Sequence, residues 1–267
     1  MPAAPVSLKS VLKRDFSFLS GVGTPIEVLL MHGQKRIISD ILLKLRFCAF
    51  EGLVRVGTLN LGPIDGHCGY DAQTWDATML YVGGEDVNVG LVTLVKMAEF
   101  LHVWNVQPEE LLTSLLVNFV SPGCLRAIGF VVEALIAMHQ HSSYLVSILG
   151  DAFEDDIRSR FHLLSGCDLT GFPEHVLWNL TRLSNLGIRS ESDVLAVVRK
   201  WGHQNGGCGR LLDNVRPCVP KRTLCELYEG VDKELCQFAF SALARRRRGL
   251  ECREGDPTLH PDLFGVC

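Results

Sequence analysis

The sequence has no long hydrophobic run and no excess of either charge. Its longest apolar stretch, Phe130–Met138, contains Glu133 and is far shorter than the roughly 20 residues that cross a membrane. The net charge is -4, with 26 Lys plus Arg against 30 Asp plus Glu, so no basic surface for a phosphate backbone is indicated. The N-terminus also lacks the apolar core of a signal peptide. We therefore expect a cytoplasmic protein that binds neither nucleic acid nor membrane.

Closely spaced cysteine pairs are also missing. None of the ten cysteines is separated from the next by only two residues, which is the spacing that brings zinc ligands together in a turn. Cys48 and Cys236 lie in apolar, helix-like stretches, where a reduced thiol packs as a small hydrophobic group. We expect reduced, mostly structural cysteines. One alternative stays open, a zinc site in which the ligands converge from Cys208, Cys218, Cys225 and His203.

Motifs for catalysis are absent as well. No serine lies in a Gly-x-Ser-x-Gly turn, and the glycines of Gly21–Gly23 precede a predicted strand, whereas a phosphate-binding turn follows one. His139 and His141 are two residues apart, so on a helix they point to different sides. These patterns give no indication of an enzyme or a cofactor. A helical enzyme with an unrecognised site is kept only as an alternative.

What the sequence does contain is enough apolar material for a large core, since 47% of its 267 residues are hydrophobic. Apolar spacing predicts an amphipathic helix over Ser7–Phe18 and strands at Ile26–Met31 and Arg36–Ser39. Val87 and Val89 form too short a pattern to assign. Further helices and one strand are expected at the following places: Asp40–Phe50, Thr58–Leu61 (the strand), Ala72–Leu80, Leu91–Val103, from Pro108, Ser121–Met138, Tyr144–Leu164, Glu174–Leu183, Val194–Trp201, Arg210–Val215 and Leu224–Leu243. The pattern predicts a mixed α/β front half and an all-helical back half.

This order of elements resembles a BTB/POZ domain followed by a BACK domain, as in kelch-like proteins. The resemblance rests on six segments that keep the order of the family: Ile26–Gly33, Thr58–Leu61, Leu80–Gly83, Met97–Leu101, Asn118–Ala134 and Gly171–Trp201. It implies an α+β BTB/POZ domain and then an all-α BACK domain. The implied divisions are a dimerisation segment at 1–19, the BTB-like domain at 20–116, the BACK-like domain at 117–243 and a basic tail at 244–267.

The resemblance also implies a function. Proteins of this family form homodimers through the first helix and strand, and their BTB surface with the first BACK helices binds a cullin-3 scaffold. Carried over by position, the dimer contacts are Leu8, Val11, Leu12 and Phe16. The cullin-facing positions are Trp75, Met79, Tyr81, Phe119 and Pro122. The chain is then expected to be a non-enzymatic ubiquitin-ligase adaptor without a metal or cofactor.

Two departures from the family pattern bear on this expectation. Glu27 and Asp40 stand where the family has other residues, and two acids facing each other in a core would be unfavourable. No kelch repeats follow the BACK-like region, so the chain would recruit its target by another surface, or pair with other kelch-like proteins and compete with them. Arg245–Arg248 is compatible with nuclear import, contact with an acidic partner, or a solvated helix end. A dimerisation scaffold that does not bind cullin is the alternative function.

Overall fold

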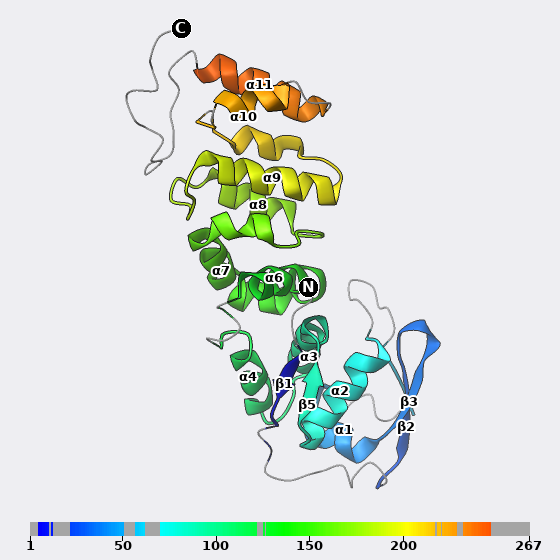
Figure 1. Ribbon diagram of the computed structural model, residues 1–267. Helices are drawn as coiled ribbons and strands as arrows, with labels where there is room; N and C mark the ends of the chain where they lie inside the picture. The colour runs from blue at the N-terminus through cyan, green and yellow to red at the C-terminus, as the bar shows by residue number, and fades with distance from the viewer. Residues whose placement is uncertain are drawn as a thin grey trace. The chain divides into compact units, whose positions relative to one another are not determined.

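The computed structural model of the protein divides the chain into two compact units, residues 1–150 and 151–267. It describes residues 5–10, 12, 22–50, 57–61, 70–121, 125, 127–216, 218–219, 221–228 and 232–246. The first unit mixes strands and helices and the second is helical, so the coarse fold class expected from the sequence is confirmed (Figure 1). Helix α7 (Ser143–Ser159) crosses the division. The domain boundary expected at residue 116 stays a prediction.

The first unit contains a three-stranded sheet in the order β3-β2-β4. Strands β2 (Pro25–Leu29) and β3 (Lys35–Ser39) form an antiparallel hairpin, and β4 (Thr58–Asn60) pairs with β2 in parallel. The hairpin turn is the 3-10 segment η2 (Met31–Gly33), in which His32 and Gly33 adopt φ of 58° and 70°. Ile26 and Val28 of β2 are buried and alternate with more exposed residues, so one face of this strand lies on the core.

Two helices of the first unit, α1 and α2, begin at capping residues. The Oγ of Ser39 accepts a hydrogen bond from the Ile41 N–H at the start of α1, and Asp71 accepts one from the Thr74 N–H at the start of α2. Gly84, with φ of 104°, ends α2. The helices and the remaining 3-10 segment have the following bounds: α1 (Asp40–Arg46), η3 (Cys48–Phe50), α2 (Ala72–Gly83), α3 (Leu91–Val103), α4 (Glu110–Val117) and α6 (Ile128–His141).

The N-terminal segment corrects one expectation. Where a helix was predicted from Ser7, residues Val6–Leu8 form strand β1, which pairs antiparallel with β5 (Val87–Val89). Leu8 is fully buried and lies opposite Val87. The apolar spacing was misread because a three-residue strand is too short to show its own period, and pairing with β5 supplies the burial that decides its conformation.

The core of the first unit is centred on Phe100 of α3, which is fully buried. The ring centroid of Phe100 lies 5.5 Å from Phe47, 4.8 Å from Tyr70 and 5.8 Å from Trp75, all with edge-to-face geometry. Such pairs stabilise a core beyond the area that they bury. Helices α3 and α6 also pack on each other, so the sheet-containing part and the first long helix after α4 share one core.

The second unit is built from helices and 3-10 segments that pack in pairs: η5 with α9, α8 with η6, and α10 with α11 (Figure 1). Their bounds are η5 (Phe161–Gly166), α8 (Glu174–Arg182), α9 (Glu191–Asn205), η6 (Gly209–Asn214), α10 (Lys221–Tyr228) and α11 (Lys233–Arg246). Ser190 precedes α9 but makes no side-chain capping bond. Within the residues that the structure describes, no helix is long and apolar enough to cross a membrane.

Candidate functional site

The predicted dimer residues do not share one exposed face. Leu8 is fully buried in β1 of its own chain, so its side chain is not available to a second copy. Leu12 is half-buried, and its N–H donates a hydrogen bond to Ser10 Oγ at 3.3 Å. Val11 and Phe16 lie outside the described residues. Burial of Leu8 therefore corrects that assignment, and Leu12 remains as the described residue that can make a dimer contact.

Three of the predicted cullin-facing residues are core residues. Trp75 is 2% exposed, and Tyr81 and Phe119 are fully buried. Tyr81 Oη donates to the carbonyl oxygen of Leu111 at 3.0 Å, and burial raises the pKa of the Tyr81 hydroxyl. These side chains shape the surface from beneath and do not themselves face a partner. Met79 is half-buried, and Pro122 lies outside the described residues.

Exposed apolar side chains flank the buried Phe119. Val117 at the end of α4 is 58% exposed and Val120 is 43% exposed. Leu111, Leu115 and Phe119 recur every four residues and are buried, so Val117 and Val120 belong to the opposite side of this segment. We call these two valines the α4 ridge. Phe119 was predicted from the sequence as a cullin-facing residue, and these valines were not. The four-residue spacing of Leu111, Leu115 and Phe119 already indicates that Phe119 lies on the buried side.

The chain at the α4 ridge is held by backbone capping. Asn118 Nδ2 donates to the carbonyl oxygens of Ser114 at 2.9 Å and Leu115 at 3.2 Å. The backbone N–H of Phe119 donates to the carbonyl oxygen of Leu116 at 3.0 Å, which continues the turn beyond α4. These bonds satisfy carbonyls that the helix end would leave open. The two valines are thus presented from an ordered turn.

Glu27 and Asp40, which differ from the family pattern, do not form a pair of uncompensated acids. Glu27 forms an ion pair with Lys35 at 2.8 Å across the hairpin. Asp40 binds the Lys44 ammonium at 2.9 Å and accepts a hydrogen bond from the Thr24 N–H at 2.8 Å. The bond from Lys44, followed by that from Thr24, lowers the pKa of Asp40. Each acid has its own cation, so neither disturbs the local packing.

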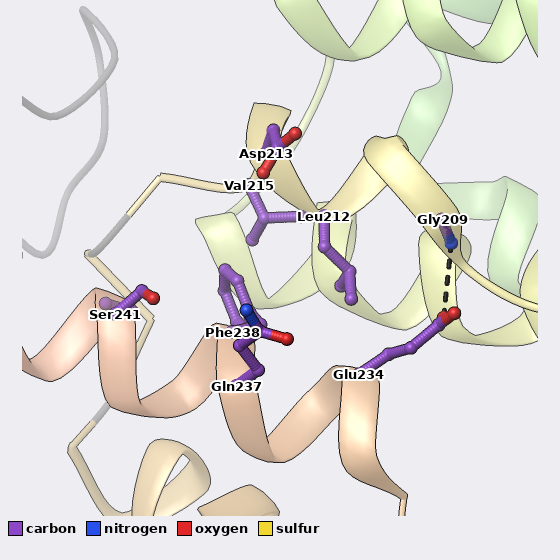
Figure 2. A pocket seen from close by; sticks show the side chains of 9 residues that line it. Gly209, Leu212, Asp213, Val215, Glu234, Gln237, Phe238 and Ser241 are labelled. Atoms are coloured by element: carbon purple, nitrogen blue, oxygen red, sulfur yellow. Dashed lines mark hydrogen bonds between the residues drawn. The ribbon is translucent and has the colours of Figure 1, made fainter.

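A small cavity in the second unit lies between η6 and α11 (Figure 2). Its volume is about 300 Å³, and Leu212, Val215 and Phe238 line it together with polar residues such as Asp213. The Glu234 carboxylate at its edge accepts hydrogen bonds from the N–H groups of Cys208 at 3.0 Å and Gly209 at 3.2 Å. Glu234 therefore anchors the start of η6 on α11. The lining of the cavity is mixed polar and apolar, and no nucleophile is hydrogen-bonded to a base among its described residues.

The cysteines are in part as expected. Among the described residues Cys48, Cys167, Cys208, Cys225 and Cys236 do not form disulfides. Cys218 is disulfide-bonded, which corrects the expectation of a reduced thiol at that position. The alternative zinc site from Cys208, Cys218, Cys225 and His203 is not assembled, since the described residues contain no group of three or more His, Cys, Asp or Glu able to hold a metal ion.

Comparison with known proteins adds no identification. No protein-family model matches the chain, and no curated protein matches it.

Proposed function

We propose that the chain is a protein-interaction adaptor, without an enzymatic activity of its own, that binds a cullin-3 type scaffold and links it to a target or competes with full-length kelch-like adaptors. The proposal begins from the resemblance to BTB/POZ and BACK domains. The order of a hairpin, a helix, a strand, further helices and then a helical unit agrees with it. The observation that carries the cullin contact is the exposed α4 ridge, at the position where the family resemblance puts the entry to the BACK domain.

The α4 ridge suits a protein contact energetically. Burial of an exposed aliphatic side chain contributes about 1.5 kcal/mol or more, so two half-exposed valines account for roughly 2 kcal/mol of binding. That corresponds to a factor of roughly 30 in a dissociation constant. The ridge would be one contact of a larger interface, since an interface of ordinary size contains many residues.

The test mixes the purified full chain with the N-terminal region of cullin-3 and follows binding by co-elution and calorimetry. A double variant, Val117→Asp with Val120→Asp, is expected to weaken binding by at least about thirtyfold, because it puts two charges into the contact. The matched control is Val92→Asp on α3, since Val92 is 47% exposed in the same unit. Thermal unfolding of all variants checks that they are folded.

Two results would contradict the proposal. If the wild-type chain does not bind cullin-3 at micromolar concentration, the dimerisation scaffold without cullin contact takes the place of this proposal. If Val92→Asp weakens binding as much as the double variant, the α4 ridge is not the contact.

A further inference from the structure

Helix α8 carries a polar and aromatic stripe on the side opposite its buried residues. Leu177 and Thr181 are fully buried, whereas Glu174, Trp178 and Arg182 follow one another at four-residue spacing on the accessible side. The Trp178 side chain is half-buried, and Arg182 is exposed. A tryptophan in such a position places a large aromatic surface at the boundary with solvent.

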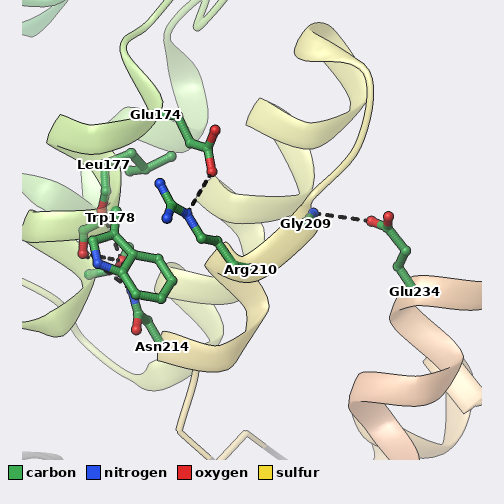
Figure 3. Close-up of polar contacts among 8 residues, drawn as sticks. Glu174, Leu177, Trp178, Gly209, Arg210, Asn214 and Glu234 are labelled. Carbon is green, nitrogen blue, oxygen red and sulfur yellow. Dashed lines mark hydrogen bonds and ion pairs between the residues drawn. The ribbon is translucent and has the colours of Figure 1, made fainter.

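Two arginines contact this tryptophan from different elements. The Arg210 guanidinium, on η6, lies 5.0 Å from the centre of the Trp178 ring, and the Arg182 guanidinium lies 5.9 Å from it. Arg210 Nε also donates to Glu174 Oε1 at 3.1 Å (Figure 3). These distances are within the range of cation–π attraction. We call Trp178, Arg182 and Arg210 the α8 patch.

The backbone beneath the α8 patch is fixed by one asparagine. Asn214 Nδ2 donates to the carbonyl oxygen of Trp178 at 3.2 Å and to Thr181 Oγ1 at 2.9 Å. Thr181 Oγ1 in turn donates to the carbonyl oxygen of Leu177 at 2.8 Å. Segment η6 is thereby attached to α8, and Arg210 is held over the ring. A preordered aromatic and guanidinium group loses less entropy when a ligand binds.

The charges of this surface are not balanced. The Glu174 carboxylate is taken by Arg210, and no carboxylate among the described residues forms an ion pair with Arg182. The indole N–H of Trp178 has no hydrogen-bond partner among the described residues and is not one of the buried unpartnered groups. One guanidinium, 5.9 Å from the centre of the indole ring, and the indole N–H of that ring are therefore available, and both are groups that donate to a carboxylate.

We propose that the α8 patch binds an acidic segment of a partner protein, with a Glu or Asp carboxylate on Arg182 and the Trp178 N–H and an apolar portion against the indole ring. Tryptophan and arginine are the residue types that most often dominate binding energy at protein interfaces. If the acidic segment belongs to the target of the adaptor, this role rests on the proposed function. Binding of an acidic segment by the α8 patch does not itself depend on cullin.

The test measures fluorescence anisotropy of the full chain with two labelled peptides. Both consist of Gly and Ser around one central Leu, and one carries Glu where the other carries Gln. The Glu peptide is expected to bind at least about tenfold more tightly, and the difference should shrink as salt is added. Arg182→Glu is expected to weaken binding of the Glu peptide about tenfold, and Trp178→Phe to weaken it through loss of the indole N–H.

The matched control is Arg222→Glu, which makes the same change of net charge on α10, where the Arg222 side chain is 91% exposed and pairs with Glu226. It should leave peptide binding unchanged. Equal binding of the Glu and Gln peptides, no binding of the Glu peptide at millimolar concentration, or an equal loss in Arg222→Glu would each overturn the inference. Cullin co-elution measured on the Arg182→Glu variant separates the two proposals, because loss of peptide binding with cullin binding retained concerns the α8 patch alone.

Discussion

Gly187 in the second unit allows a prediction whose size follows from the geometry. A Cβ atom added at Gly187 would lie 1.9 Å from the carbonyl oxygen of Ser159 and 2.4 Å from its carbonyl carbon. Real Cβ atoms keep at least 3.0 Å from other heavy atoms, so the difference, 3.0 minus 1.9, requires a displacement of about 1.1 Å. The obstructing atoms are backbone atoms of Ser159, the last residue of α7, which cannot rotate away. Gly187→Ala must therefore move the loop that follows α8.

That displacement breaks specific hydrogen bonds. The Gly187 N–H donates to the Arg158 carbonyl oxygen at 2.8 Å, and the Gly187 carbonyl oxygen accepts from the His162 N–H at 3.0 Å. Each bond contributes about 1 kcal/mol, and forcing an extra methyl group into a packed site costs about 1–3 kcal/mol. Gly187→Ala is expected to lower the free energy of unfolding by about 3–5 kcal/mol, a large part of the stability of an ordinary domain.

The control and the assay isolate this effect. At Gly166 an added Cβ meets nothing within 4 Å, so Gly166→Ala should change stability little. Guanidinium unfolding gives the free energy, and hydrogen exchange at the His162 amide reports the opening of this loop in the native protein. If Gly187→Ala unfolds at the same denaturant concentration as Gly166→Ala, with the His162 amide equally protected, Gly187 does not pack closely against the Ser159 backbone.

Three further predictions concern the termini of helices, the thiols and the dimer. The pKa of Asp40 is lowered below its ordinary 3.8, so the stabilisation that its carboxylate provides is present above pH 3.8 and is lost as the pH falls through the lower pKa of the folded state. Asp40→Asn should remove this part of the acid dependence of the thermal midpoint. An unchanged acid dependence in the variant would contradict the prediction. Burial raises the pKa of Cys208 to about 11, so iodoacetamide at mildly alkaline pH should modify the exposed Cys48 well before Cys208, as mass spectrometry of the native protein can show. Leu12→Asp should yield monomers in sizing chromatography with light scattering, whereas a dimer of wild-type affinity would exclude Leu12 from the contact.

Much of the helical structure was predictable because capping and periodicity acted together. Gly84 and Gly206 end α2 and α9 in the left-handed conformation that glycine favours, and in the sequence each belongs to a pair of adjacent glycines. The continuous helix expected over Ser121–Met138 is interrupted at Ala127, which has an extended conformation and directly precedes α6. Asp193 does not complete a capping box with Ser190, because its carboxylate accepts from the Arg189 N–H at 2.8 Å.

The candidate sites were less predictable than the helices because they depend on contacts between distant segments. Periodicity could separate Phe119 from Val117 and Val120, but it could not show that Trp75 packs on Phe100. The α8 patch joins residues 32 positions apart, since Trp178 precedes Arg210 by 210 minus 178. No local sequence motif predicts the contact between Arg210 and Trp178, because it arises from packing of η6 on α8.

The position of β3 at the edge of the three-stranded sheet bears on how the protein behaves in concentrated solution. Within the described residues β3 pairs only with β2, and Ile37 on it is 77% exposed. A strand with an open edge and an exposed apolar side chain can template pairing with another chain. Lys35 and Arg36 directly precede Ile37 on β3, and their ion pairs with Glu27 and Asp76 keep charge close to the strand. High salt, which screens these charges, is the condition under which self-association through β3 would first be seen.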